Sequence, residues 1–165
     1  MGRLPATFAD CEVKDRFPYA LEGEMAMATA SRGVQFPDAL FTNGTDKPFE
    51  CHRMIPRLYA RASNNTLLVT QPDQELLAGL IRLDIVINNL EQKLTKAPSL
   101  VGTLTKGSAE RTWEFADPCY LVRSSGFQVT VDSVTYPAIE NLNNILVSIT
   151  FQGFLLVIHP PTPNR

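Results

Sequence analysis

The clearest pattern along the chain is an alternation of apolar and polar residues with a period of two. Residues 80–88 place isoleucine and leucine side chains on one face of an extended chain and polar side chains on the other, with Val86 as the apolar exception. Residues 127–132 and 145–152 repeat the alternation. A period of two is typical of half-buried β-strands. The pattern therefore predicts a strand in each of these segments.

Weaker patterns predict further strands. Pro56 interrupts one of them, residues 49–60, and because proline cannot donate to a sheet it predicts an edge position or a bulge. Gly153 breaks the last alternation and predicts a bulge before an apolar run. The one helical signal is a turn or two at residues 72–79. The remaining predicted strands are residues 67–70, 111–115, 119–123 and 154–158.

Strands alone explain nearly all of the apolar pattern, which indicates an all-β protein. The chain has 165 residues, enough for one domain with a sizeable core. Seven or eight short strands separated by turn residues favour two packed antiparallel sheets. We expect an antiparallel β-sandwich of jelly-roll type.

The first part of the chain has a different character. Residues 1–47 are punctuated by proline and glycine, and only residues 24–29 alternate well enough to suggest a strand. Such a long irregular segment is uncommon in a compact domain, so we expect an extended arm that wraps its own domain or lies on a neighbour. The predicted division is an arm at 1–47, a sandwich at 48–158 and an extended proline-rich tail at 159–165.

Aromatic residues in this segment are candidate anchors for a contact with a neighbouring subunit. The alternative is that they cover the open end of their own sandwich. For Phe36 and Phe41, which adjoin the domain, this alternative is almost as well supported as a contact with a neighbour. Cys11, in the same segment, is a candidate for an intersubunit disulfide. The five candidate anchors are Phe8, Phe17, Tyr19, Phe36 and Phe41.

Charge and hydropathy favour no binding to nucleic acid or membrane. Fifteen basic and seventeen acidic side chains leave a net charge of −2, which gives no sign of the basic patch that phosphate binding needs. No window has the 18 or more unbroken apolar residues of a membrane helix. The N-terminus lacks the pattern of a signal peptide, so we expect a protein made and kept in the cytoplasm.

Residues for catalysis or metal binding are sparse in this sequence. The two histidines, His52 and His159, are far apart, and Cys51 and His52 are adjacent, so on a strand they point to opposite faces. No phosphate-binding loop, dinucleotide-binding or nucleophile-elbow motif is present. We therefore expect no metal, no cofactor and no enzymatic activity. The three cysteines, Cys11, Cys51 and Cys119, form no CxxC pair and are expected to be free thiols, most of them buried.

Four segments, residues 49–57, 111–115, 127–131 and 149–156, resemble the small jelly-roll or sandwich proteins of tailed-bacteriophage virions in the order and style of their strands. These proteins decorate capsids or build neck and tail rings. The resemblance covers residues 45–158 and includes no diagnostic motif. It implies a non-enzymatic structural protein of the virion, with copies of itself and other virion proteins as partners. Homo-oligomers formed by exchange of arms would suit residues 1–47.

A carbohydrate-binding jelly-roll module is the alternative function. Such a module needs exposed aromatic side chains on a common surface. Trp113 is the only tryptophan, and its alternation with Phe115 places both toward the core, while Glu114 between them faces solvent. The four tyrosines lie in four different segments. The sequence therefore ranks this alternative second.

Overall fold

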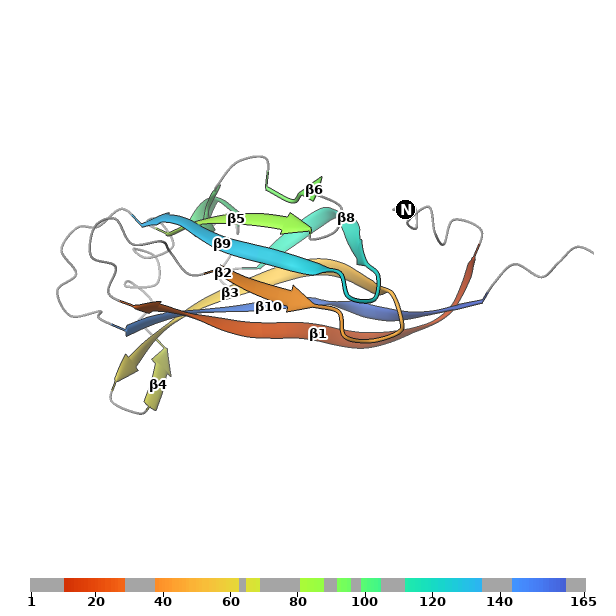
Figure 1. Cartoon of the computed structure of the whole chain (residues 1–165), viewed down its shortest axis with the longest axis horizontal. Coiled ribbons are helices and arrows are strands. Elements are labelled where there is room, and N and C mark those ends of the chain that lie inside the picture. The colour runs from red at the N-terminus through yellow and green to blue at the C-terminus, as the bar shows by residue number, and fades with distance from the viewer. Residues whose placement is uncertain are drawn as a thin grey trace, which may run out of the picture.

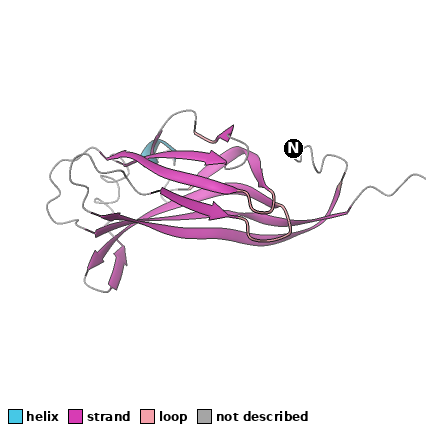
Figure 2. Ribbon diagram, viewed as in Figure 1, coloured by secondary structure: helices cyan, strands magenta, loops and turns pink. Residues whose placement is uncertain are grey.

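The computed structural model describes residues 11–28, 38–62, 65–68, 81–87, 92–95, 99–104, 112–134 and 144–159. These residues form two antiparallel sheets packed face to face, with one short helical segment (Figures 1 and 2). The predicted all-β sandwich is confirmed.

The first sheet contains the longest strands. Its order is β1 (Glu12–Ala28), β10 (Asn144–His159) and β3 (Phe49–Ala62). The far side of β3 pairs with two strands at different points along its length, β8 (Trp113–Leu121) and β4 (Asn65–Leu68). In Figure 1, β1 and β10 run side by side along the bottom of the molecule.

The second sheet is smaller and lies above the first in Figure 1. Its order is β2 (Asp38–Thr42), β9 (Gly126–Val134) and β5 (Ile81–Ile87), with β6 (Gln92–Lys93) and β7 (Ser99–Leu100) both on the far side of β5. A single helical turn, α2 (Val101–Leu104), follows β7. The helical turn expected at residues 72–79 lies outside the described residues.

The core fills the space between the two sheets. The four residues of β5 predicted to share a face are all buried, as the alternation indicates. At the centre, the rings of Phe127 on β9 and Phe151 on β10 stack with their centroids 4.1 Å apart. Phe41 on β2 meets Phe151 edge-on at 5.2 Å. Alternation in the sequence thus predicted which faces of β5, β9 and β10 form the core.

The expectation of an arm ending at residue 47 is wrong for the described residues 12–28 and 38–42. These residues are strands of the two sheets, and Leu21, Met25 and Phe41 belong to the core. β1 is an edge strand, paired only with β10 among the described residues, so it accommodates Pro18 and several charged side chains. Those residues hide its alternation from the sequence. Residues 1–10, 29–37 and 160–165 lie outside the described residues.

Pro56 and Gly153, which predict irregularities within strands, both lie at irregular points of the first sheet. Pro56 lies in the gap between the parts of β3 that pair with β8 and with β4, which agrees with the expected edge position. The register of β3 against β10 shifts between Gln152 and Gly153, which confirms a bulge there. A side chain at Gly153 would overlap the carbonyl group of Glu50, so only glycine allows the two strands to approach this closely.

Asn43 joins the two loops at one end of the sandwich. Its amide nitrogen donates to the carbonyl oxygens of Lys47 and Leu121, at 2.9 and 3.1 Å. Its amide oxygen accepts from the backbone and hydroxyl of Thr45. Its backbone donates to the carbonyl oxygen of Ser125 at 2.8 Å. These bonds explain why a polar side chain is fully buried here.

Candidate functional site

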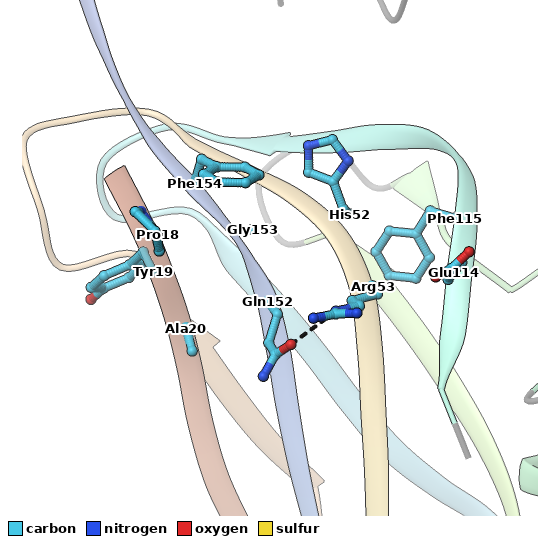
Figure 3. A pocket seen from close by; sticks show the side chains of 10 residues that line it. All are labelled: Pro18, Tyr19, Ala20, His52, Arg53, Glu114, Phe115, Gln152, Gly153 and Phe154. Carbon is cyan, nitrogen blue, oxygen red and sulfur yellow. Dashed lines mark hydrogen bonds between the residues drawn. The ribbon is translucent and has the colours of Figure 1, made fainter. Parts of the chain in front are cut away.

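A partly open groove of about 720 Å³ lies on the face of the first sheet that points away from the core (Figure 3). Residues of β1, β10, β3 and β8 line it. The core-facing residues of β3 and β10, such as Met54 and Phe151, are fully buried on the opposite side of the sheet. The groove is therefore a surface feature of the sheet and is separate from the space between the layers.

A bulge in β3 brings two consecutive side chains to the groove. Cys51 pairs with Gly153 and with Cys119, whereas Arg53 pairs with Gln152 and with Glu114, so His52 has no partner residue on either neighbouring strand. The extra residue changes the phase of the strand. His52 and Arg53 consequently both line the groove, although neighbouring strand residues normally point to opposite faces.

Three polar side chains form a row across the floor of the groove. Gln152 of β10, Arg53 of β3 and Glu114 of β8 are aligned in register on adjacent strands. Arg53 Nε donates to Gln152 Oε1 at 2.9 Å, the bond drawn in Figure 3. The row therefore presents an amide, a guanidinium and a carboxylate side by side.

Apolar groups border this row. The ring of Phe154 on β10 meets the imidazole of His52 edge-on, with centroids 5.6 Å apart. Phe115 on β8 lies beside Arg53 in Figure 3, and its ring contacts Trp113 at 4.9 Å. Pro18 of β1 closes the side beyond β10. The groove thus combines ring surfaces with planar polar groups.

A buried carboxylate holds the imidazole in place. Glu50 is 4% exposed, and its Oε1 lies 2.6 Å from His52 Nε2. Its Oε2 accepts from Arg16 Nη2 at 3.5 Å, across β10. Tyr120, its register partner on β8, also donates a hydrogen bond to it. Because a carboxylate only accepts, Nε2 of His52 carries a proton, and in the neutral imidazole Nδ1 is then the acceptor.

The electrostatics of this cluster affect Tyr120. Burial raises the pKa of the Tyr120 phenol, and the neighbouring charge of Glu50 raises it further.

The pairing of His52 with the buried Glu50 resembles the arrangement in which a carboxylate orients a histidine that acts as a general base. Among the described residues that line the groove there is no serine, threonine or cysteine. The bond from Glu50 orients His52 as a hydrogen-bonding group at the edge of the groove.

The cysteines of β3 and β8 lie outside the groove and opposite one another. Cys51 and Cys119 are register partners, and both are free thiols. Burial raises the pKa of Cys51 strongly, and the nearby Cys119 raises it further. Burial and the charge of Asp117 raise the pKa of Cys119 to about 11. Both thiols are thus protonated near neutral pH. Only Cys51 of the three cysteines is buried, whereas Cys11 and Cys119 are half-buried, so the expectation that most of the thiols are buried is wrong.

The predicted anchor residues do not form one cluster. Phe41 is buried in the core of its own sandwich, so its assignment as an interface anchor is corrected to the alternative role. Tyr19 is half-buried and packs edge-on against the core residue Phe49 at 5.6 Å. Phe17 is 53% exposed. Phe8 and Phe36 lie outside the described residues.

Phe17 marks the base of a two-stranded ribbon. β10 pairs with β3 only as far as Leu155, whereas it continues to pair with β1 as far as His159. Residues 12–16 and 156–159 therefore extend past the paired part of the third strand, at the right of Figure 1. Together with Phe17 and Leu155 at their base, they are called the ribbon below. Cys11, half-buried and free, directly precedes it.

The described residues contain no group of three or more histidine, cysteine, aspartate or glutamate side chains that could hold a metal ion. No helix among them is long and apolar enough to cross a membrane.

No protein-family model matches this chain, and neither the curated proteins nor the solved structures include a significant match. What the groove and the ribbon can bind follows from their own side chains.

Proposed function

We propose that this protein is a non-enzymatic structural subunit that assembles with copies of itself. The observation that carries the proposal is the ribbon, a two-stranded projection with an exposed phenylalanine at its base. A two-stranded antiparallel ribbon is only marginally stable in water unless it packs on something. A neighbouring subunit would supply that packing.

The ribbon offers apolar surface for this contact. Val13, Val157 and Ile158 are only partly buried, in addition to the exposed Phe17. Burying one phenylalanine side chain stabilises a contact by roughly 1.5–3 kcal/mol. The charges at its start, Glu12, Lys14, Asp15 and Arg16, cancel. Two copies of the ribbon would therefore not repel each other, which favours a second copy of this chain as the partner.

The outer edge of β1 disfavours a different mode of assembly, the addition of a further strand. Pro18 lacks a backbone donor, and the register shifts between Val13 and Asp15. Prolines, bulges and charged side chains are the features by which edge strands avoid further pairing. Packing through the faces of the ribbon is therefore favoured over exchange of strands along β1.

The virion is the setting in which we place this assembly. The resemblance of the strand segments to tailed-phage capsid-decoration and neck or tail ring proteins supports it, as does a sandwich with a projecting ribbon. In such a particle the partners are copies of this chain and other virion proteins. Cys11, at the start of the ribbon, is positioned to reinforce the contact by a disulfide to a neighbour.

Substitution of Phe17 tests the proposal. The variant Phe17→Ser is expected to shift the purified protein from oligomer toward monomer in sedimentation-velocity experiments. Leu40→Ser is the matched control, because Leu40 is 52% exposed on β2 but lies outside the ribbon. The proposal is overturned if both variants retain the oligomer, or if both lose it equally.

A further inference from the structure

We infer that the groove on the first sheet binds a neutral oligosaccharide built of pyranose rings. This inference is independent of the proposed assembly, because the groove and the ribbon's exposed Phe17 use different residues. It rests on the juxtaposition of ring surfaces with a row of planar polar groups (Figure 3).

The size and shape of the groove fit a short saccharide. Its volume of about 720 Å³ falls in the range of small-molecule sites, roughly 300–1,000 Å³. It crosses several strands and is partly open, so a chain of sugar units can enter from the surface and continue beyond it. A closed cavity would instead suit a single compact molecule.

The polar row matches the hydroxyl groups of a sugar. Each hydroxyl both donates and accepts a hydrogen bond, so a sugar site needs donors and acceptors close together. Gln152 and Arg53 supply donors, Glu114 supplies acceptors, and the Nδ1 atom of His52 adds a further polar group. The Arg53–Gln152 bond and the His52–Glu50 bond already order these side chains. Binding then costs less side-chain entropy, because the site is preorganised.

The aromatic rings of the groove match the apolar C–H face of a sugar ring. One face of a pyranose ring carries C–H groups, which pack against aromatic rings. Phe154 and Phe115 stand on opposite sides of the β3 residues His52 and Arg53 in Figure 3. Two such walls can contact successive sugar units lying across the strands.

The charges in and under the groove favour a neutral ligand. Arg53 lies opposite Glu114 on the adjacent strand, and Arg16 pairs with the buried Glu50. Apart from His52, the described residues that line the groove include one cation, Arg53, and one carboxylate, Glu114, so their formal charges sum to zero. Acidic glycans are therefore expected to bind more weakly than neutral ones.

The experiment begins with an array of neutral and acidic glycans probed with the full-length protein. The neutral glycan that binds best is then titrated while the fluorescence of Trp113 is followed. Trp113 is the only tryptophan of the chain and contacts Phe115, a wall of the groove. A saturable change in its emission is expected.

Variants then locate the site. Phe154→Ala and Gln152→Ala are each expected to weaken binding by about tenfold or more. Arg57→Ala is the matched control, because Arg57 is exposed on the adjacent strand β3, which also contributes to the groove, but does not itself line it. It should change affinity by less than about twofold. Phe154→Tyr, which keeps the ring, should retain binding and so separates loss of contact from loss of fold.

Three results would overturn the inference. One is that no neutral glycan binds. Another is that only acidic glycans bind. The third is that binding persists in both Phe154→Ala and Gln152→Ala. Each leaves the assembly proposal untouched, because that proposal is tested by oligomer size in variants of a different surface.

Discussion

At the scale of single residues, the stability of this sandwich depends on buried polar groups as well as on its apolar core. Glu50 and Asn43 are both nearly inaccessible to solvent, and each is satisfied by several hydrogen bonds. Alternation in the sequence identified the apolar core residues of β5, β9 and β10. It does not reveal a buried glutamate, because two of the partners of Glu50, Arg16 on β1 and Tyr120 on β8, are distant from it in sequence.

Replacement of Asn43 tests the junction of the two loops. Asn43→Ala removes two amide donors to buried carbonyl groups and an acceptor for Thr45. We expect the free energy of unfolding to fall by about 2–4 kcal/mol, measured by urea denaturation. Gly44→Ala is the control in the same loop, because an added Cβ there meets no atom within 4 Å, and it should change stability little. Equal effects of the two substitutions would contradict the role of the Asn43 side chain.

The raised pKa of Cys119 should make the folded protein less stable at alkaline pH. Its pKa is raised from 9.0 to about 11 in the folded protein, so between these values the folded state holds a proton that the unfolded state has released. The contribution of Cys119 to the free energy of unfolding should therefore be constant below pH 9 and fall as the pH rises toward 11. Cys119→Ala should reduce this decline by about 1–2 kcal/mol. The measurement is urea denaturation at a series of pH values.

Cys51 and Tyr120 set the background for that experiment. Burial raises the pKa of both groups, so each lowers the stability of the folded protein in the same direction as Cys119, and Cys119→Ala retains both. A decline with the same slope in the original protein and the variant would show that Cys119 does not contribute.

At the scale of elements, the bulge between β3 and β10 is the feature that creates the groove. In the sequence, Gly153 predicts a bulge where the alternation of β10 breaks, and the register shift between Gln152 and Gly153 confirms the bulge. The effect on β3 could not be predicted, because no glycine or proline marks His52 within its own strand. The pairing of Gln152, Arg53 and Glu114 also depends on contacts between three distant segments. The sequence therefore predicted the bulge but not the groove.

Gly153→Ala tests the close approach of the two strands. The new methyl group would overlap the carbonyl of Glu50 and force β3 and β10 apart. We expect a loss of at least about 2 kcal/mol in the free energy of unfolding. We also expect the change in Trp113 emission on glycan binding to be lost, since the row of polar residues would move out of register. A variant with unchanged stability and normal glycan binding would contradict this, because it would show that β3 and β10 can separate at residue 153 without loss of stability.

At the scale of the whole molecule, the main correction concerns the first 47 residues. The sequence predicted two packed sheets because alternation is strong in β5, β9 and β10. It did not show that β1 is the longest strand, since Pro18, Gly23 and the charges of an edge strand mask its alternation. β1 pairs with β10, more than 100 residues away, and such pairing leaves no local signal. Deletion of residues 1–44 would thus remove two strands of the sandwich.

This correction moves the expected contact between subunits from a free arm to the ribbon. Of the aromatic residues predicted to be anchors, Phe17 is the one that the described structure leaves exposed. The ribbon also begins beside Cys11, so one projection carries both an apolar contact and a thiol. Self-assembly through this projection is the central claim of the account.

The mass of the purified full-length protein in solution, measured by light scattering over a range of concentrations with and without a reducing agent, tests that claim most directly. The account predicts a discrete oligomer, and one that reductant weakens in the original protein but not in Cys11→Ser. A protein that remains an 18.3 kDa monomer at every concentration would contradict it.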